Sequence, residues 1–121
     1  MIRIMDNAIE IMAPVGSMES LAAAIQGGAD SVYFGIGKLN MRSRSSQNFT
    51  LDDLSRVCKI CRKKNVKTYL TLNTVVYDEE IAEMHRLVDA AKKSGITAII
   101  ASDQSVIQYA YSQGVAVHIS T

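Results

Sequence analysis

The sequence predicts an α/β protein whose parallel strands alternate with helices, arranged as the N-terminal half of a TIM-barrel-like (β/α) barrel. Three observations support this fold class: a stop signal that repeats before short apolar runs, helical periodicity between those runs, and a last strand that no helix follows. The expected half-barrel has about five strands and four helices, so the barrel is incomplete.

The repeated stop signal is a glycine or asparagine followed by a short run rich in apolar and β-branched residues. Glycine and asparagine are favoured where the chain turns left-handed after a helix, and the runs that follow are typical of strands. The four units lie at residues 28–34, 65–70, 95–100 and 114–119. An earlier run at residues 9–13 has the same strand composition, which brings the expected strands to five.

The segments between these strands carry apolar residues at spacings of three and four, which predicts amphipathic helices. Each helix is expected to begin after a residue whose side-chain oxygen can accept a free backbone N–H group. The expected N-cap residues are Ser17, Thr50, Asp78 and either Ser102 or Asp103. Asp53 follows Thr50 by three residues, which approaches a capping box.

Two architectures fit this order of elements. Five strands can complete an open doubly wound sheet, whereas a TIM barrel needs eight strands and typically about 250 residues. The single apolar stripe of each helix favours the barrel, and so does a chain that stops on a strand at residues 119–121. We assign residues 1–8 to an N-terminal leader and residues 9–121 to the N-terminal half of a barrel domain, which we expect to be truncated.

The composition is that of an ordinary globular protein, with 48% hydrophobic residues, 21% charged residues and a net charge of +1. This balance indicates neither a nucleic acid nor an acidic substrate. No apolar run approaches the roughly 20 residues that span a bilayer, so we expect no membrane span and a cytoplasmic protein. Cys58 and Cys61 share the apolar stripe of one helix, which predicts core residues and no metal site.

Ligands of parallel α/β proteins meet the carboxyl ends of the strands. At the first of these ends, the N–H groups of Gly16 and Ser17 can hold an anion, or Ser17 can simply cap the helix. The second connection, residues 35–48, is long for a strand-to-helix loop. Its Arg42, Arg44 and Asn48 form either a clamp for an anionic substrate or nucleic-acid backbone, or a solvated polar loop.

The candidate catalytic residues follow three later strands. Asn73 offers an amide at the end of one strand, and Asp103 stands where it can act chemically or only cap its helix. His118 lies near the end of the last strand, where an imidazole can act as a base, a ligand or a polar anchor. Tyr33 lies within a strand and is a further candidate for substrate binding, or a core residue.

Several segments resemble consecutive signatures of the collagenase-like peptidases, peptidase family U32. The clearest are residues 10–17 (EIMAPVGS), 27–35 (GGADSVYFG) and 67–73 (KTYLTLN). Residues 40–42 with 48–50 are similar to the long second loop of that family, and residues 102–104 and 118–121 resemble its fourth and fifth strand ends. The resemblance runs continuously from residue 9 to residue 121.

This resemblance implies a TIM-barrel-like catalytic domain and, by the family name, a peptidase. It also implies an alternative, since family members act in hydroxylation of RNA bases or of the ubiquinone ring with an iron–sulfur cluster. Their four cluster cysteines lie downstream of this region, and Cys58 and Cys61 do not correspond to them. We therefore expect no cofactor in this segment and a possible cluster in the C-terminal part.

Three functional hypotheses follow from the residues and the resemblance. The full protein is a peptidase, or it is an iron–sulfur-dependent enzyme that modifies RNA or a quinone, or this chain is a non-catalytic barrel fragment. The substrate is accordingly a peptide, an RNA or a quinone. A half-barrel also exposes two sheet edges, so we expect the isolated chain to self-associate and to be inactive alone.

Overall fold

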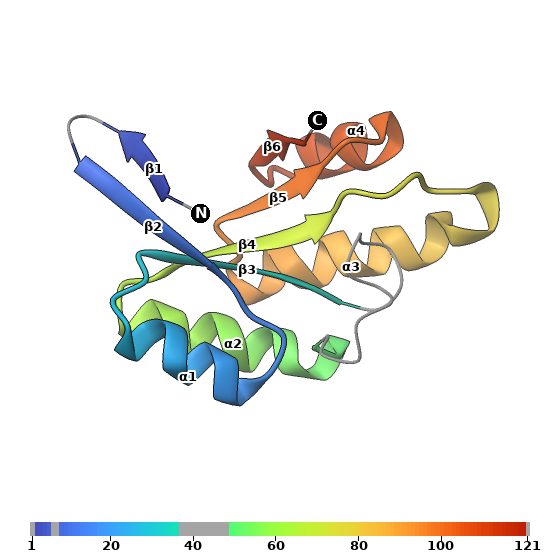
Figure 1. Ribbon diagram of the computed structural model, residues 1–121. Coiled ribbons are helices and arrows are strands. Elements are labelled where there is room, and N and C mark those ends of the chain that lie inside the picture. Colours follow the sequence, from blue (N-terminus) through green and yellow to red (C-terminus); the bar gives the residue numbers. More distant parts are fainter. Residues whose placement is uncertain (1, 6–7, 37–48, 121) are drawn as a thin grey trace.

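The computed structural model describes residues 2–5, 8–36 and 49–120 (Figure 1). The strands are β1 (Ile2–Met5), β2 (Ala8–Pro14), β3 (Ser31–Gly35), β4 (Lys67–Leu72), β5 (Ala98–Ala101) and β6 (Val117–Ile119). The helices are α1 (Met18–Gln26), α2 (Leu51–Lys63), the short 3-10 helix η1 (Asp78–Glu80), α3 (Ile81–Ser94) and α4 (Gln104–Ser112).

The described strands form one sheet in the order β1-β2-β3-β4-β5-β6. Strands β2 to β6 are parallel and follow one another in chain order, with a helix in each connection. Helices α1, α2 and α3 lie together on one side of β3 and β4 (Figure 1). The sheet is not closed, because β1 and β6 stand at opposite ends of the strand order. The predicted parallel α/β fold with five barrel-type strands and four helices is therefore confirmed.

Strand β1 differs from the sequence-based expectation. We expected residues 1–8 to be a leader, but residues 2–5 pair antiparallel with β2, with Ile2 opposite Ile11 and Met5 opposite Ala8. Four residues are too few for a strand period to be recognised in the sequence, and the pairing with β2 makes this segment a strand.

The N-caps explain where the helices begin. Ser17 accepts a hydrogen bond from the backbone N–H of Ser20 at 3.1 Å. At α2, the Asp53 carboxylate accepts from both the backbone N–H and the hydroxyl of Thr50, at 2.9 and 3.0 Å. These bonds lower the pKa of Asp53, the backbone bond most. The helix expected to start after Asp78 is preceded instead by the 3-10 turn η1. The Glu80 carboxylate accepts a hydrogen bond from the backbone N–H of Tyr77 at 3.0 Å, which stabilises this turn.

The predicted left-handed stops are present at all four positions. Asn65, Gly28, Gly95 and Gly114 have positive φ angles of 60°, 91°, 85° and 77°. At Gly95 the neighbouring side chain is also close, because the Arg62 guanidinium donates a hydrogen bond to the carbonyl oxygen of Ser94 at 2.8 Å. A Cβ atom on residue 95 would collide with that guanidinium.

We predict that Gly95→Ala lowers the free energy of unfolding by about 1–2 kcal/mol from backbone strain alone, and somewhat more because Arg62 must move. Gly114→Ala is the matched control, since it has a similar φ but no atom within 4 Å of its Cβ position. Urea denaturation of both variants, with and without Arg62→Ala, measures the difference. Equal losses in the two variants would show that the Arg62 contact is neutral.

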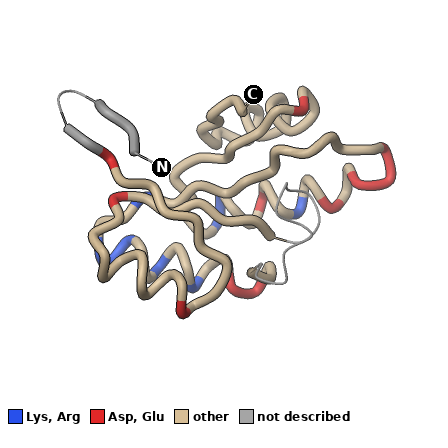
Figure 2. The backbone as a smooth tube through the Cα atoms, in the orientation of Figure 1, with Lys and Arg blue, Asp and Glu red and all other residues tan. Residues whose placement is uncertain are grey.

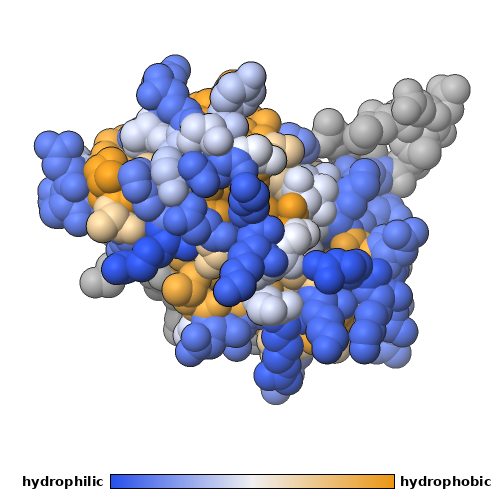
Figure 3. Space-filling model, turned by 180° about the vertical axis from the view of Figure 1, so that it is seen from behind, coloured by the Kyte–Doolittle hydropathy of each residue, from blue (hydrophilic) through white to orange (hydrophobic). Residues whose placement is uncertain are grey.

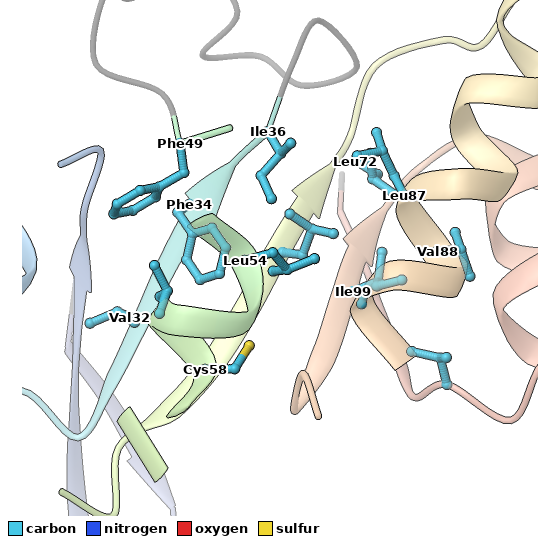
Figure 4. Packing of buried hydrophobic residues seen from close by; sticks show 14 of the residues in the cluster. Val32, Phe34, Ile36, Phe49, Leu54, Cys58, Leu72, Leu87, Val88 and Ile99 are labelled. Carbon is cyan, nitrogen blue, oxygen red and sulfur yellow. The ribbon is translucent and has the colours of Figure 1, made fainter. Parts of the chain in front are cut away.

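The main core lies between the sheet and its helices. Figure 4 shows Val32 and Phe34 of β3 directed towards Leu54 and Cys58 of α2. Each of these four side chains is at most 2% exposed. The apolar helix faces predicted from the spacing therefore include the buried residues, and they pack against one face of the sheet.

Cys58 and Cys61 are both in this core, as predicted. Burial raises the pKa of the Cys58 thiol, although a hydrogen bond with Thr68 and the charge of Arg62 oppose the shift. Burial, with Cys58 nearby, raises the pKa of Cys61 to about 11. Both groups are thus protonated thiols at neutral pH.

We predict that Cys58→Ala lowers the free energy of unfolding by about 1–2 kcal/mol, as a core truncation does, measured by denaturant titration. The native protein should also react slowly with a thiol reagent, because the reactive species is the thiolate. The same protein in denaturant serves as the control and should react fast. Fast reaction in the native state would contradict the buried assignment.

Charged residues lie at the helix ends where they oppose the helix dipole. Acidic residues gather before α3 and at the start of α2, whereas basic residues gather in the last turn of α2 (Figure 2). On the face seen in Figure 3, hydrophilic side chains predominate and hydrophobic ones show between them. Among the helices that the structure describes, none has the length and apolar character needed to cross a membrane.

Candidate functional site on the inner face of the sheet

The face of the sheet opposite the helices, here called the inner face, carries the candidate site. Side chains alternate along a strand, so residues in register share a face. Tyr33, Tyr69 and Ala98 are in register across β3, β4 and β5. The inner face of the parallel strands includes Met12, Tyr33, Tyr69, Ala98, Ile100 and His118.

His118 meets Tyr69 on this face. Their ring centroids are 5.2 Å apart with an interplanar angle of 40°. Tyr69 is 3% exposed and also packs in one cluster with Met12. Met12, Tyr69 and His118 come from the alternate strands β2, β4 and β6, which is how the interior layers of a TIM barrel are built.

Few described residues contact the His118 ring. Its side chain is exposed, and within the described part of the chain its ring contact is with Tyr69 and it makes no hydrogen bond. Tyr33 is half-buried beside Tyr69. The structure thus brings together two predicted site residues, Tyr33 and His118, around Tyr69.

Asp103 has a clear structural task. Its Oδ1 accepts from the backbone N–H and hydroxyl of Ser105 at 2.8 and 2.6 Å, and its Oδ2 accepts from the backbone N–H of Val76 at 2.9 Å. These bonds lower the pKa of Asp103, with the Ser105 hydroxyl contributing most. Asp103 therefore caps α4 and holds the connection between β4 and α3.

Asn73 lies at the start of that connection. Its backbone carbonyl oxygen accepts a hydrogen bond from the Ser102 hydroxyl at 3.2 Å. Together with the bond from Val76 to Asp103, this contact joins the carboxyl ends of β4 and β5. Asn73 is half-buried at this edge, as the strand-end rule predicts.

At the first strand end, Ser20 occupies the N–H groups that we considered for anion binding. The Ser20 hydroxyl accepts from the backbone N–H groups of Gly16 and Ser17, both at 3.0 Å. An anion would have to displace this hydroxyl, so a ligand role for Gly16 and Ser17 stays a prediction. The remaining predicted binding residues, Arg42, Arg44 and Asn48, lie outside the described residues.

A second feature of the inner face went unnoticed in the sequence. Lys67 of β4 donates to Glu10 Oε1 of β2 at 3.3 Å, although Glu10 is only 8% exposed. Because β3 lies between those strands, the ion pair spans it beside the buried Ser31. No local pattern announces this pair, since its partners are 57 residues apart.

A metal or cluster does not fit the residues described. In the ranges 2–5, 8–36 and 49–120, no group of three or more histidine, cysteine or acidic side chains converges. Cys58 and Cys61 face the helix side of the sheet as protonated thiols. An iron–sulfur cluster therefore finds no ligand set in this part of the chain.

The five parallel strands in chain order and the helix that connects each pair of them define a TIM-barrel-like α/β protein. The crystal structure of Bacillus subtilis HMG-CoA lyase supports this fold, with a TM-score of 0.67 at 19% identity over 89% of this chain and 43% of that one. The model of peptidase family U32 matches residues 16–121, and the chain belongs to this family.

Relatives of the chain carry two kinds of name. It is 63% identical to "Collagenase" of Porphyromonas gingivalis over 95% of this chain and 28% of that protein. It is 28% identical to "tRNA hydroxylation protein P1" of Bacillus subtilis over 98% and 28%. It is 26% identical to the "23S rRNA 5-hydroxycytidine C2501 synthase" of Escherichia coli over 84% and 15%. The chain thus spans about a quarter or less of the length of these relatives.

Proposed function

We propose that the protein containing this chain is a U32 enzyme that hydroxylates a base of tRNA or rRNA in the cytoplasm. The observation that carries the proposal is the inner face itself. It offers the exposed imidazole of His118, which contacts the buried ring of Tyr69, and the half-buried ring of Tyr33, and flat rings of this kind suit a nucleic-acid base. Relatives named for tRNA and rRNA hydroxylation support the same reaction.

Six of the predicted residues have a role in this proposal. Tyr33, Asn73 and His118 contact the target base, and Arg42, Arg44 and Asn48 bind the RNA backbone. Guanidinium groups suit phosphate because they pair with it in a fork. Any iron–sulfur cluster is expected to be bound by residues outside this chain.

A second candidate function is hydrolysis of peptide bonds in collagen-like substrates. It is favoured by the 63% identity to a protein named Collagenase, which is the highest of the relatives given above. On this reading the nucleophile or catalytic metal also lies outside the described residues. The two candidates share the barrel mouth but differ in the bond that is made or broken.

The deciding experiment compares both activities of the full-length protein. We expect deletion of its gene to remove a hydroxylated nucleoside from tRNA or rRNA digests analysed by mass spectrometry, and the wild-type gene to restore it. The purified protein is tested in parallel on denatured collagen. Unchanged nucleosides together with collagen cleavage would replace the first candidate by the second.

We predict that Arg42→Ala weakens RNA binding by the full-length protein and reduces the salt slope of log Kd by about one. Lys92→Ala is the control, since Lys92 is exposed in the last turn of α3, away from the strand ends. Binding isotherms between 50 and 200 mM salt, roughly the range in which phosphate contacts weaken most visibly, give both slopes. An unchanged slope for Arg42→Ala would remove this loop from the RNA site.

A further inference from the structure

We propose that Tyr33, Tyr69 and His118 form a stacking site for a planar heteroaromatic ring. On the proposed function, which this inference extends, the ring is the target base of the RNA. The site is a surface of the inner face, which no relative's name assigns. Its physical basis is one fixed ring with two accessible ones beside it.

Tyr69 is the fixed element. It is 3% exposed, and Met12 and Ala98 share its cluster, with Tyr33 and Ile100 packed against it. A ring held on several sides keeps its orientation, so it orders the His118 ring that leans on it at 5.2 Å. Tyr69 is therefore a positioning residue rather than a group that meets the substrate with its full face.

His118 and Tyr33 supply the accessible surface. His118 is exposed and Tyr33 half-buried, on strands that flank β4 and β5. The imidazole nitrogens of His118 can donate to or accept from the edge of a base, and its ring already leans on Tyr69. The ring faces provide stacking, which every base accepts because each has a π-face.

The position in the barrel agrees with this use. Interior layers of a TIM barrel draw side chains from alternate strands, and substrates enter at the carboxyl ends. The polar pair Glu10 and Lys67 lies on the same strands two residues before Met12 and Tyr69, on the amino-terminal side. Tyr33, Tyr69 and His118, here called the aromatic layer, therefore lie between the ion pair on the amino-terminal side and the carboxyl ends of the strands. A ring that enters at the carboxyl ends meets the aromatic layer before it meets the ion pair.

The test follows His118 and His85 by NMR in the full-length protein, with labelled histidine side chains and each signal assigned from its His→Gln variant. The probes are uridine 5′-monophosphate, cytidine 5′-monophosphate and ribose 5-phosphate, which has a phosphate but no base. We expect the nucleotides to shift the His118 ring signals saturably and ribose 5-phosphate to leave them in place. His85, stacked on Tyr109 at 3.8 Å away from the inner face, is the internal reference and should not move.

The variants separate stacking from general loss of structure. Tyr69→Leu should weaken nucleotide binding about tenfold, within the range for losing one aromatic stacking partner. Tyr33→Leu removes a half-buried ring and should also weaken nucleotide binding. This second variant keeps the test decisive if Tyr69→Leu does not fold. Tyr77→Leu is the matched control, because Tyr77 is 63% exposed before η1 and should leave binding unchanged.

The stacking site is overturned if the nucleotides leave His118 unmoved, if ribose 5-phosphate shifts it equally, or if Tyr33→Leu and folded Tyr69→Leu bind as wild type. Failure of the proposed function has a different signature. In that case the nucleosides of the deletion strain stay unchanged although the ring binds. A collagen-derived peptide that shifts His118 while nucleotides do not would likewise reject the ring as the ligand.

Discussion

Phe34→Ala is expected to lower the free energy of unfolding by about 3–5 kcal/mol, as for large core truncations that leave a cavity. Phe34, the last residue but one of β3, is 0% exposed. Its ring packs edge-on against Phe49, with the centroids 5.5 Å apart. This contact and the bridge between Ile36 and Phe49 join β3 to the residues just before α2, so the loss affects the packing of that helix start on the sheet as well.

The measurement is equilibrium unfolding in guanidinium chloride with a tyrosine or circular dichroism signal. Phe34→Leu should cost clearly less, because it keeps most of the buried volume. Tyr77→Ala is the surface control, since a ring that is 63% exposed should change stability by no more than about 0.5 kcal/mol. Similar losses at Phe34 and Tyr77 would contradict the core assignment.

Much of the fold follows from the sequence because its signals are local. The left-handed stops at Asn65 and Gly95 and the N-caps at Ser17 and Thr50 are decided within a few residues of each position. Helical spacing then identifies the buried stripes. Strand β1 was not predicted because four residues are too few to show a strand period. Its pairing with β2 is what makes it a strand.

The site was predicted less completely because it depends on contacts between distant segments. The strand-end rule places Asn73 and Asp103 correctly, yet it cannot show that both carboxylate oxygens of Asp103 are already used. Tyr69 and His118 are 49 positions apart in the printed numbering and meet because β4, β5 and β6 lie next to one another in the sheet. The helical or strand period of one segment cannot predict a contact between two side chains from distant segments.

Asp103→Ala is expected to lower the free energy of unfolding by about 2 kcal/mol. Loss of the α4 cap accounts for roughly half of this, and loss of the hydrogen bond from Val76 to a charged acceptor for the rest. Ser105→Ala is the control, since it removes one donor while the backbone N–H of residue 105 still meets the carboxylate. Its cost should be clearly smaller in the same denaturation assay.

The pH dependence of this contribution has a definite sign. Because the pKa of Asp103 is lowered in the folded protein, the unfolded chain binds the proton more readily, and stability rises with pH through this group. The contribution is fully present above the unfolded pKa of about 3.9 and is lost as pH falls through the lower folded value. The difference between wild type and Asp103→Ala should therefore be constant from pH 7 to about 5 and shrink below pH 4.

This prediction also separates the two roles considered for Asp103. A structural cap predicts that Asp103→Asn, which can still accept from Ser105, keeps most of the stability and most of the activity of the full-length protein. If Asp103 is instead a catalytic carboxylate, the same variant keeps its stability but its turnover falls about 100-fold or more. His118→Gln provides the comparison, because His118 carries no structural hydrogen bond in the described residues and should reduce turnover at little cost in stability. If Asp103→Asn abolishes turnover while His118→Gln leaves it intact, the chemistry of the inner face belongs to the β5 strand end rather than to the aromatic layer.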